Sequence, residues 1–196
     1  MINNVTYDGK VVSVPVFSHE TNGRNYYAFY MSCTRKSGTD DVIPVIIKSS
    51  LIEKFPIIKG DKIRITGRFQ SKNTDDGKLL LYLKAFNVKR AKKRSCKNDV
   101  ILEGIICKPT SFRSTKSGKP VCDLILKNIS DSDNATYYIP CICWYSEALK
   151  GSLYEVGTKI TVTGRLQSRQ YIKIDDKKSK TIKTAYELSV SDIKKD

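Results

Sequence analysis

The sequence of 196 residues has little of what catalysis and metal binding usually require. Its single histidine, His19, excludes a two-histidine metal site and a histidine relay, and we interpret it as an ordinary loop residue. Neither a Gly-x-x-x-x-Gly-Lys-Ser/Thr phosphate loop nor a Gly-x-Ser-x-Gly turn occurs. The Asp pairs at 40–41, 75–76 and 175–176 fall at expected hairpin turns, where Asp bonds the local backbone. We therefore expect no catalytic residue, no metal and no cofactor, and predict that the chain is not an enzyme.

Long apolar segments are also missing. No run of about 18 apolar residues is present to span a bilayer, and residues 1–7 lack the charged and apolar regions of a secretory signal. We expect a cytoplasmic protein with no membrane partner. Because thiols stay reduced in that compartment, we interpret the six cysteines as small hydrophobic residues. Cys141 and Cys143 alternate with Ile142 in an apolar run, which places both on one face of a strand.

Positive charge is in large excess over negative charge. The chain has 35 Lys and Arg against 20 Asp and Glu, for a net charge of +15 at pH 7. A sustained positive potential attracts polyanions. Nucleic acid or an anionic membrane surface would fit this charge, and a role in solubility is the alternative. The basic residues occur along the whole sequence, so no single tail holds the excess.

One segment of the sequence occurs twice. Residues 59–71, KGDKIRITGRFQS, align with residues 156–168, VGTKITVTGRLQS, with 8 identical positions of 13 and an offset of 97. We predict two copies of one unit, a diverged domain at 1–90 and a second domain at 100–196, joined by a linker at 91–99. The linker is strongly basic, and a solvated connector is favoured over a phosphate-contacting strap or a localisation signal.

Each copy has the apolar pattern of short strands, rich in β-branched and aromatic residues. Strands are expected in the first copy at 7–17, 26–34, 42–48, 62–72 and 78–89, and in the second at 102–112, 121–128, 137–144, 159–174 and 181–190. A short helix is expected after the third strand of each copy, at 49–55 and 146–150. This is the element order of the OB-fold, a Greek-key barrel that binds oligonucleotides. We predict an all-β chain of two tandem five-stranded OB-fold barrels.

The second copy resembles the bacterial single-stranded DNA-binding protein family over most of residues 100–190. The resemblance is carried by Glu103-Gly104, by the segments TKSGKPV at 115–121 and YIPCICWY at 138–145, and by GTKITVTGRLQSR at 157–169. The first copy is similar mainly through the repeat. The resemblance implies an OB-fold that binds single-stranded DNA with little sequence preference.

Members of this family stack bases on aromatic side chains, and three such positions are matched in the second copy by Tyr138, Trp144 and Tyr171. Packing against neighbouring side chains is the alternative for each of them, most of all for Trp144, which closes an apolar strand. The first copy has Thr74 at the position of Tyr171 and no aromatic at that of Trp144. It is therefore expected to bind more weakly, or to use Tyr26 and Tyr30, among its other tyrosines, instead.

Basic residues accompany the proposed stacking residue of the fourth strand. Arg165, Arg169 and Lys173 are separated from Tyr171 by even intervals, which places all four on one face of a strand. A basic groove that tracks phosphates and aromatic faces that stack bases are the two requirements for holding a single strand. Further candidates for contacts with nucleic acid, each with a solvated charge as the alternative, are Arg113, Lys116, Arg24, Arg68 and Lys72.

The resemblance also bears on partners. Typical family members end in a flexible acidic tail that recruits other proteins, whereas this sequence ends in SDIKKD at 191–196. Recruitment by that route is not expected, and a specialised role on a phage or mobile element is suggested. Because typical members assemble four OB-folds, a homodimer of this chain is expected by analogy.

We predict a protein that coats single-stranded DNA in replication, recombination or repair. An RNA-binding protein is one alternative, because OB-folds serve both nucleic acids. A protein-interaction module of the primosome type is another, favoured by the altered aromatic positions of the first copy. A nuclease is the enzymatic alternative, because a fold alone does not determine function.

Overall fold

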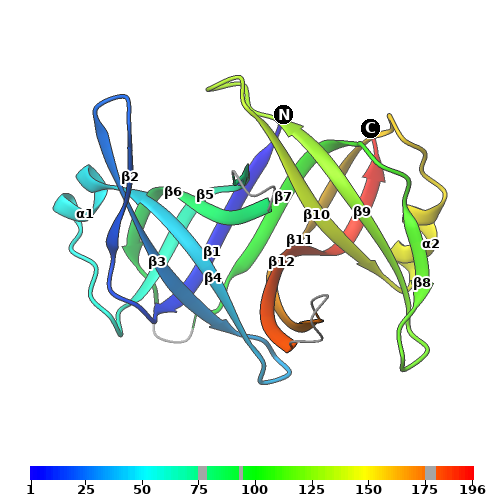
Figure 1. Ribbon diagram of the computed structural model, residues 1–196, viewed down its shortest axis with the longest axis horizontal. Helices are drawn as coiled ribbons and strands as arrows, with labels where there is room; N and C mark the ends of the chain where they lie inside the picture. The colour runs from blue at the N-terminus through cyan, green and yellow to red at the C-terminus, as the bar shows by residue number, and fades with distance from the viewer. Residues whose placement is uncertain (75–78, 93–94, 175–179) are drawn as a thin grey trace.

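The computed structural model describes residues 1–196 except 75–78, 93–94 and 175–179 (Figure 1). The N-terminal half contains β1 (Asn3–Val11), β2 (Val16–Thr21), β3 (Arg24–Thr34), β4 (Asp40–Lys48), α1 (Ser49–Lys54), β5 (Lys62–Asn73) and β6 (Leu79–Arg90). The C-terminal half contains β7 (Asn98–Ile106), β8 (Ser111–Ser114), β9 (Pro120–Ile129), β10 (Thr136–Trp144), α2 (Ser146–Ser152), β11 (Lys159–Ile174) and β12 (Lys180–Lys195). The prediction of an all-β chain is confirmed.

Among the described residues, neither helix has the length and apolar character needed to cross a membrane.

The strands of each half close a circuit of hydrogen-bonded pairings. In the N-terminal half, β1 pairs with β5, β5 with β6, β6 with β4, β4 with β3, and β3 with β1 again. The C-terminal half has the same circuit in β7, β11, β12, β10 and β9. All of these pairings are antiparallel except β4–β6 and β10–β12, which are parallel. The two short helices lie at opposite ends of the molecule (Figure 1).

Within the described residues, each half has six strands where five were expected. The first strand predicted for each copy, at 7–17 and at 102–112, divides into two strands, β1 with β2 and β7 with β8. Pro15 and Pro109 lie in the breaks, and proline supplies no backbone N–H to continue a strand ladder. The added strands, β2 and β8, pair with β3 and β9, respectively, and extend the sheet at its two edges.

Alternating apolar residues form the core, as the strand periodicity predicts. Ile63 and Ile65 of β5 and Ile160 and Val162 of β11 are fully buried at equivalent positions. Four of the six cysteines, including Cys141 and Cys143, are buried as small core residues. Of the other two, Cys107 is half-buried, whereas Cys96 is exposed in the segment between the halves and is not a core residue.

The two halves meet through β1 and β7, which lie side by side in the middle of the molecule (Figure 1). The pairing is antiparallel, with Asn3 opposite Leu102 and Tyr7 opposite Asn98. Each asparagine makes two hydrogen bonds to one backbone residue of its own half. The Asn3 amide bonds the peptide N–H and C=O of Phe69, and the Asn98 amide bonds those of Leu166. The interface between the halves is therefore nearly symmetric.

The end of the basic linker predicted at 91–99 is held against the N-terminal half. Asn98 already belongs to β7, and the N–H of Asp8 donates to the carbonyl of Lys97 at 2.7 Å. The buried Asp8 carboxylate accepts hydrogen bonds from Arg64 and from the hydroxyl of Ser95. Burial would raise the pKa of Asp8, but these hydrogen bonds outweigh it and hold the pKa below its usual value. Residues 93–94 of this segment lie outside the described residues.

Candidate nucleic-acid interface

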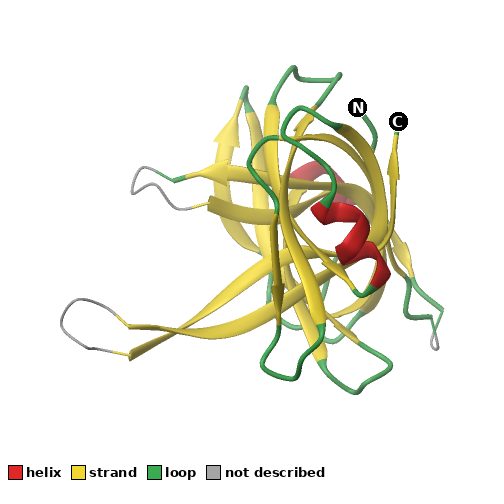
Figure 2. Ribbon diagram, turned by 90° about the vertical axis from the view of Figure 1, so that its right-hand side faces the viewer, coloured by secondary structure: helices red, strands yellow, loops and turns green. Residues whose placement is uncertain are grey.

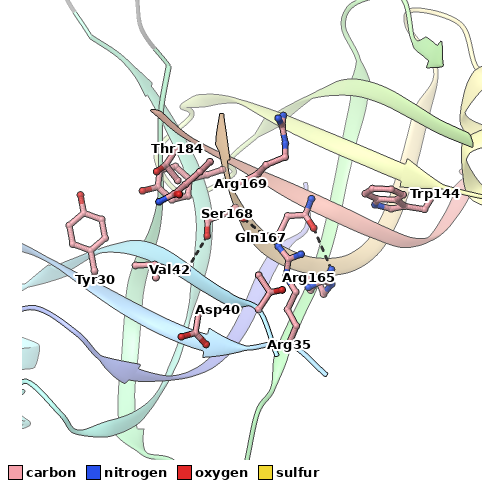
Figure 3. A pocket seen from close by; sticks show the side chains of 13 residues that line it. Tyr30, Arg35, Asp40, Val42, Trp144, Arg165, Gln167, Ser168, Arg169 and Thr184 are labelled. Atoms are coloured by element: carbon pink, nitrogen blue, oxygen red, sulfur yellow. Dashed lines mark hydrogen bonds between the residues drawn. The ribbon is translucent and has the colours of Figure 1, made fainter. Parts of the chain in front are cut away.

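A groove of about 980 Å³, the seam groove, runs between the two halves of the molecule (Figure 3). Both halves line it, with Tyr30, Arg35, Thr39, Asp40, Val42, Trp144, Arg165, Gln167, Ser168, Arg169, Gln170, Thr184 and Tyr186. In Figure 3 the arginines lie between Tyr30 on one side and Trp144 on the other. Four residues predicted from the sequence for nucleic-acid contact are thereby brought to one groove: Tyr30, Trp144, Arg165 and Arg169.

Two of the arginines that line the seam groove, Arg35 and Arg165, are held by one buried carboxylate. Asp41 of β4 is 1% exposed and accepts two hydrogen bonds from Arg35, at 2.6 and 2.7 Å. Arg165, from the other half, approaches the same carboxylate at 3.3 Å, and the backbone N–H of Ser168 donates to it at 2.8 Å. The hydrogen bonds to Asp41 raise the pKa of Arg35, whereas burial and the charge of Arg35 lower that of Arg165. Asp41 was predicted to be a turn residue, and its burial between the halves corrects that prediction.

Two serines make equivalent hydrogen bonds across the seam, the contact between the two halves. The Ser168 hydroxyl accepts from the backbone N–H of Val42 at 3.0 Å, as the dashed line in Figure 3 shows. The Ser71 hydroxyl accepts from the backbone N–H of Tyr138 at 2.8 Å. Both serines end the repeated Gly-Arg-x-Gln-Ser segment, so the repeat supplies the same contact to the interface twice. Arg68 also crosses the seam, and donates to Ser130 and Ser132.

A second groove of about 590 Å³, the hairpin groove, continues from the seam groove. Tyr30, Thr184 and Tyr186 line both grooves. The hairpin groove is more apolar, with Tyr82 and exposed leucines from the β5–β6 hairpin on one side and Tyr171 from β11 on the other. The β5–β6 and β11–β12 hairpins project from the same side of the molecule (Figure 2). An extended ligand in both grooves would therefore touch both halves.

The aromatic residues of the two halves occupy different strands. In the C-terminal half, Tyr138 and Trp144 belong to β10, on the outer face of the β9–β10 pair. In the N-terminal half, Tyr26 and Tyr30 belong to β3, on the outer face of the β3–β4 pair. Trp144 pairs across the strands with Val121, whereas at the equivalent rung Tyr26 pairs with Lys48. An aromatic residue is thus present at this rung in both halves, on the first strand of the β3–β4 pair and on the second strand of the β9–β10 pair.

A model of the single-strand binding protein family matches residues 97–195, which is half of the chain. The chain belongs to the single-strand binding protein family. Among solved structures, the wild-type single-stranded DNA binding protein from Thermus aquaticus has a TM-score of 0.78 and 19% identity, and covers 100% of this chain and 93% of its own. A deletion mutant of the same protein has a TM-score of 0.74 and 20% identity, over 100% of this chain and 94% of its own. The whole chain therefore has the fold of the Thermus protein. A search of curated proteins found no match.

Within the described part of the chain, the other basic residues that were predicted to contact nucleic acid are not among the residues that line the two grooves. Arg113 forms an exposed ion pair with Asp123 at 2.7 Å. Lys116, Arg24 and Lys72 are exposed, respectively in the turn before β9, at the start of β3 and in β5. Arg68 lies over the ring of Phe86 as well as at the seam. The backbone of Lys173 belongs to β11, but its side chain lies outside the described residues, as do the Asp pairs at 75–76 and 175–176.

Three placements were not predicted: Arg35 and Asp41 at the contact between the halves, and His19 outside both grooves. Arg35 comes from the β3–β4 turn and reaches the seam only because the other half packs there. Asp41 was assigned to a turn, although its place in an alternating strand pattern indicates burial. His19, expected in a loop, lies in β2 and stacks on Tyr26. Only the pattern around Asp41 could have been found in the sequence, because Arg35 contacts Ser168 of the other half and His19 is positioned by a register shift between β2 and β3.

Proposed function

We propose that this family member binds single-stranded DNA along the seam and hairpin grooves, with each half acting as an OB-fold domain. The two domains are residues 1–90 and 100–196. The observation that carries the proposal is the seam groove, in which aromatic and arginine side chains from both halves line one continuous surface. The chain acts by binding, and no catalytic step is assigned to it.

Base stacking would supply much of the affinity. Tyr30, Trp144 and Tyr171 lie along the two grooves, and Tyr30 and Tyr171 are each about 40% exposed (44% and 40%). Stacking of a base on an aromatic ring contributes about 1–3 kcal/mol and tolerates any sequence, because every base has a π-face. The guanidinium of Arg169 lies over the ring of Tyr171, 6.0 Å from its centre, so a base would stack on the opposite face of that ring.

Phosphate contacts would supply the rest. Arg169 is about half exposed, at 55%, and faces the seam groove with Arg35 and Arg165. Because Arg35 and Arg165 also hold Asp41, each can offer only part of its guanidinium to a phosphate. Each neutralised phosphate releases counterions, so affinity should fall as salt concentration rises.

The proposal predicts quenching of the fluorescence of Trp144, the only tryptophan, when oligo-dT is added. Binding should weaken at least tenfold between about 50 and 200 mM salt, if a few phosphates are contacted. Tyr171→Ala should lower affinity by roughly 5- to 150-fold, the loss of one stacked base, whereas Tyr171→Phe keeps the ring and should bind within about twofold of the natural protein. Oligo-dT that leaves the fluorescence unchanged at low salt would refute the proposal.

RNA is the alternative ligand, because a base stacks in the same way on either backbone. Competition between oligo-dT and oligo-U, in the same fluorescence assay, decides between them. We expect oligo-dT to displace oligo-U at lower concentration. A role in replication, recombination or repair follows from DNA binding and is part of the proposal.

We also propose that two copies associate, which would bring four OB-folds together. Light scattering should then give a mass near twice the chain mass of 22.2 kDa. A mass equal to that of one chain would contradict the association but leave the proposed binding site intact, because both grooves are formed within one chain.

A further inference from the structure

A flat aromatic stack stands on the outer face of the N-terminal half. The ring of His19 lies parallel to that of Tyr26, with 4.9 Å between ring centres and 9° between ring planes. The ammonium group of Lys84 lies over the Tyr26 ring, 5.7 Å from its centre. In the sheet order β2-β3-β4-β6, His19 and Lys84 come from opposite sides of the strand that carries Tyr26. We infer from this order that they cover opposite faces of Tyr26, which leaves the outer face of His19 as the open end of the stack.

A strand irregularity puts His19 in this position. β2 and β3 pair Phe17 with Tyr27, and then shift register so that His19 is opposite Tyr26. Without the shift, Ser18 would be opposite Tyr26 and the imidazole would be one residue out of line. Such bulges turn a side chain to a new direction and are common beside functional sites. Phe17 is also exposed, and it packs edge-on against Tyr27 and not on the stack of His19 and Tyr26.

The stack lies at the rung that carries Trp144 in the other half. Tyr26 is opposite Lys48, and the equivalent pair in the C-terminal half is Val121 opposite Trp144. Strand β8 brings Arg113 opposite Val121, at the place where β2 brings His19. This rung therefore combines an aromatic surface with a basic side chain in both halves, although the residues that provide them differ.

The surroundings of His19 favour a neutral ring next to positive charge. Partial burial, and then the charges of Lys72 and Lys84, lower the pKa of His19, which favours the uncharged imidazole. His19 itself is exposed to solvent. An uncharged aromatic face for a base, with ammonium groups close enough to meet a phosphate, is the combination that sequence-tolerant strand binding uses.

We infer that His19 is a base-stacking residue, and that its open ring face takes one nucleobase of a bound single strand. The inference rests on the proposed function and extends the strand path beyond the two grooves to the edge strand β2. It also gives Tyr26 a different task from the one predicted: Tyr26 supports the imidazole and does not meet the base itself.

Proton NMR tests the inference directly, because His19 is the only histidine and its imidazole Cε1–H signal is unambiguous. Addition of oligo-dA should move this signal upfield by the ring current of a stacked purine. An abasic phosphodiester oligomer of the same length, which offers phosphates without bases, should leave the signal nearly in place. Trp144 fluorescence, read on the same samples, reports strand binding independently.

The outcomes separate the two proposals. If oligo-dA quenches Trp144 but leaves the His19 signal in place, the inference is wrong and the proposed function stands. If neither signal responds, both are wrong. His19→Ala should weaken binding about fivefold or more, and His19→Phe should restore it, since a flat ring suffices for stacking. Phe17→Ala removes another exposed ring of the same strand that packs on Tyr27 and not on Tyr26, so it is the matched control and should bind as the natural protein does.

Discussion

Replacing Asp41 with asparagine should lower the free energy of unfolding by about 3 kcal/mol, because removal of one partner from a buried ion pair leaves the other charge uncompensated. The carboxylate is 1% exposed and is the common acceptor for Arg35, Arg165 and the N–H of Ser168. Asparagine keeps the shape and one acceptor but not the charge. Partial solvent access to the arginines places the expected loss at the lower end of the range for buried pairs.

Urea unfolding of Asp41→Asn beside Asp123→Asn measures this effect. Asp123 also pairs with an arginine, Arg113, but both side chains are well exposed, at 39% and 47%. Exposed pairs contribute about 0–1 kcal/mol, so the control should remain close to the natural protein. Equal losses for the two variants would mean that Asp41 does not hold the halves together.

Gly164→Ala should be equally damaging, with a loss of about 3 kcal/mol. A Cβ at Gly164 would lie 2.1 Å from the carbonyl oxygen of Ser189 on the paired strand, far inside contact distance. Gly67 is in the same situation, with a Cβ 2.0 Å from the carbonyl oxygen of Lys84. At both glycines the ladder shifts register, so the close approach belongs to the strand irregularity that bends β5 and β11.

Gly151→Ala provides the matched control for that substitution. Gly151 lies in α2, and a Cβ there would meet its nearest atoms at 3.5 Å, an ordinary contact. Alanine is about 1 kcal/mol better than glycine within a helix, so this variant should be as stable as the natural protein or more stable. Thermal unfolding monitored by circular dichroism compares the three proteins. A Gly164→Ala protein with an unchanged melting temperature would show that the strands can separate locally at no cost.

The strands could be predicted from the sequence because each half buries one face of its sheet. Alternation of residues such as Ile63 and Ile65 requires only local periodicity and a core. The division of the first strand at Pro15 could also have been read locally, since proline ends a ladder, but the apolar residues on both sides concealed it. The repeated Gly-Arg-x-Gln-Ser segment was used only to predict the two copies. Its serines also make equivalent hydrogen bonds between the halves.

The residues of the candidate site that share one strand could be predicted from the sequence. Those that come together from different strands could not. Arg165, Arg169 and Tyr171 share β11, so their spacing places them together. Arg35 joins them only because it is bound to Asp41, its neighbour in the N-terminal half, and Asp41 lies against β11 of the C-terminal half. The stack of His19 on Tyr26 depends on a register shift in an edge strand, and no residue pattern specifies that shift. Packing between the halves determines the position of Arg35, and the local register shift determines that of His19. The types of the side chains alone disclose neither.

Ultraviolet crosslinking of the protein to oligo-dT, with the crosslinked peptides identified by mass spectrometry, tests the central claim that one strand lies in grooves formed by both halves. Crosslinks should map to Trp144 and Tyr171 of the C-terminal half and to Tyr30 of the N-terminal half. High salt should abolish all three together. Crosslinks confined to one half, or found only at Tyr145 and Tyr154 beside α2, would contradict a strand path through the seam.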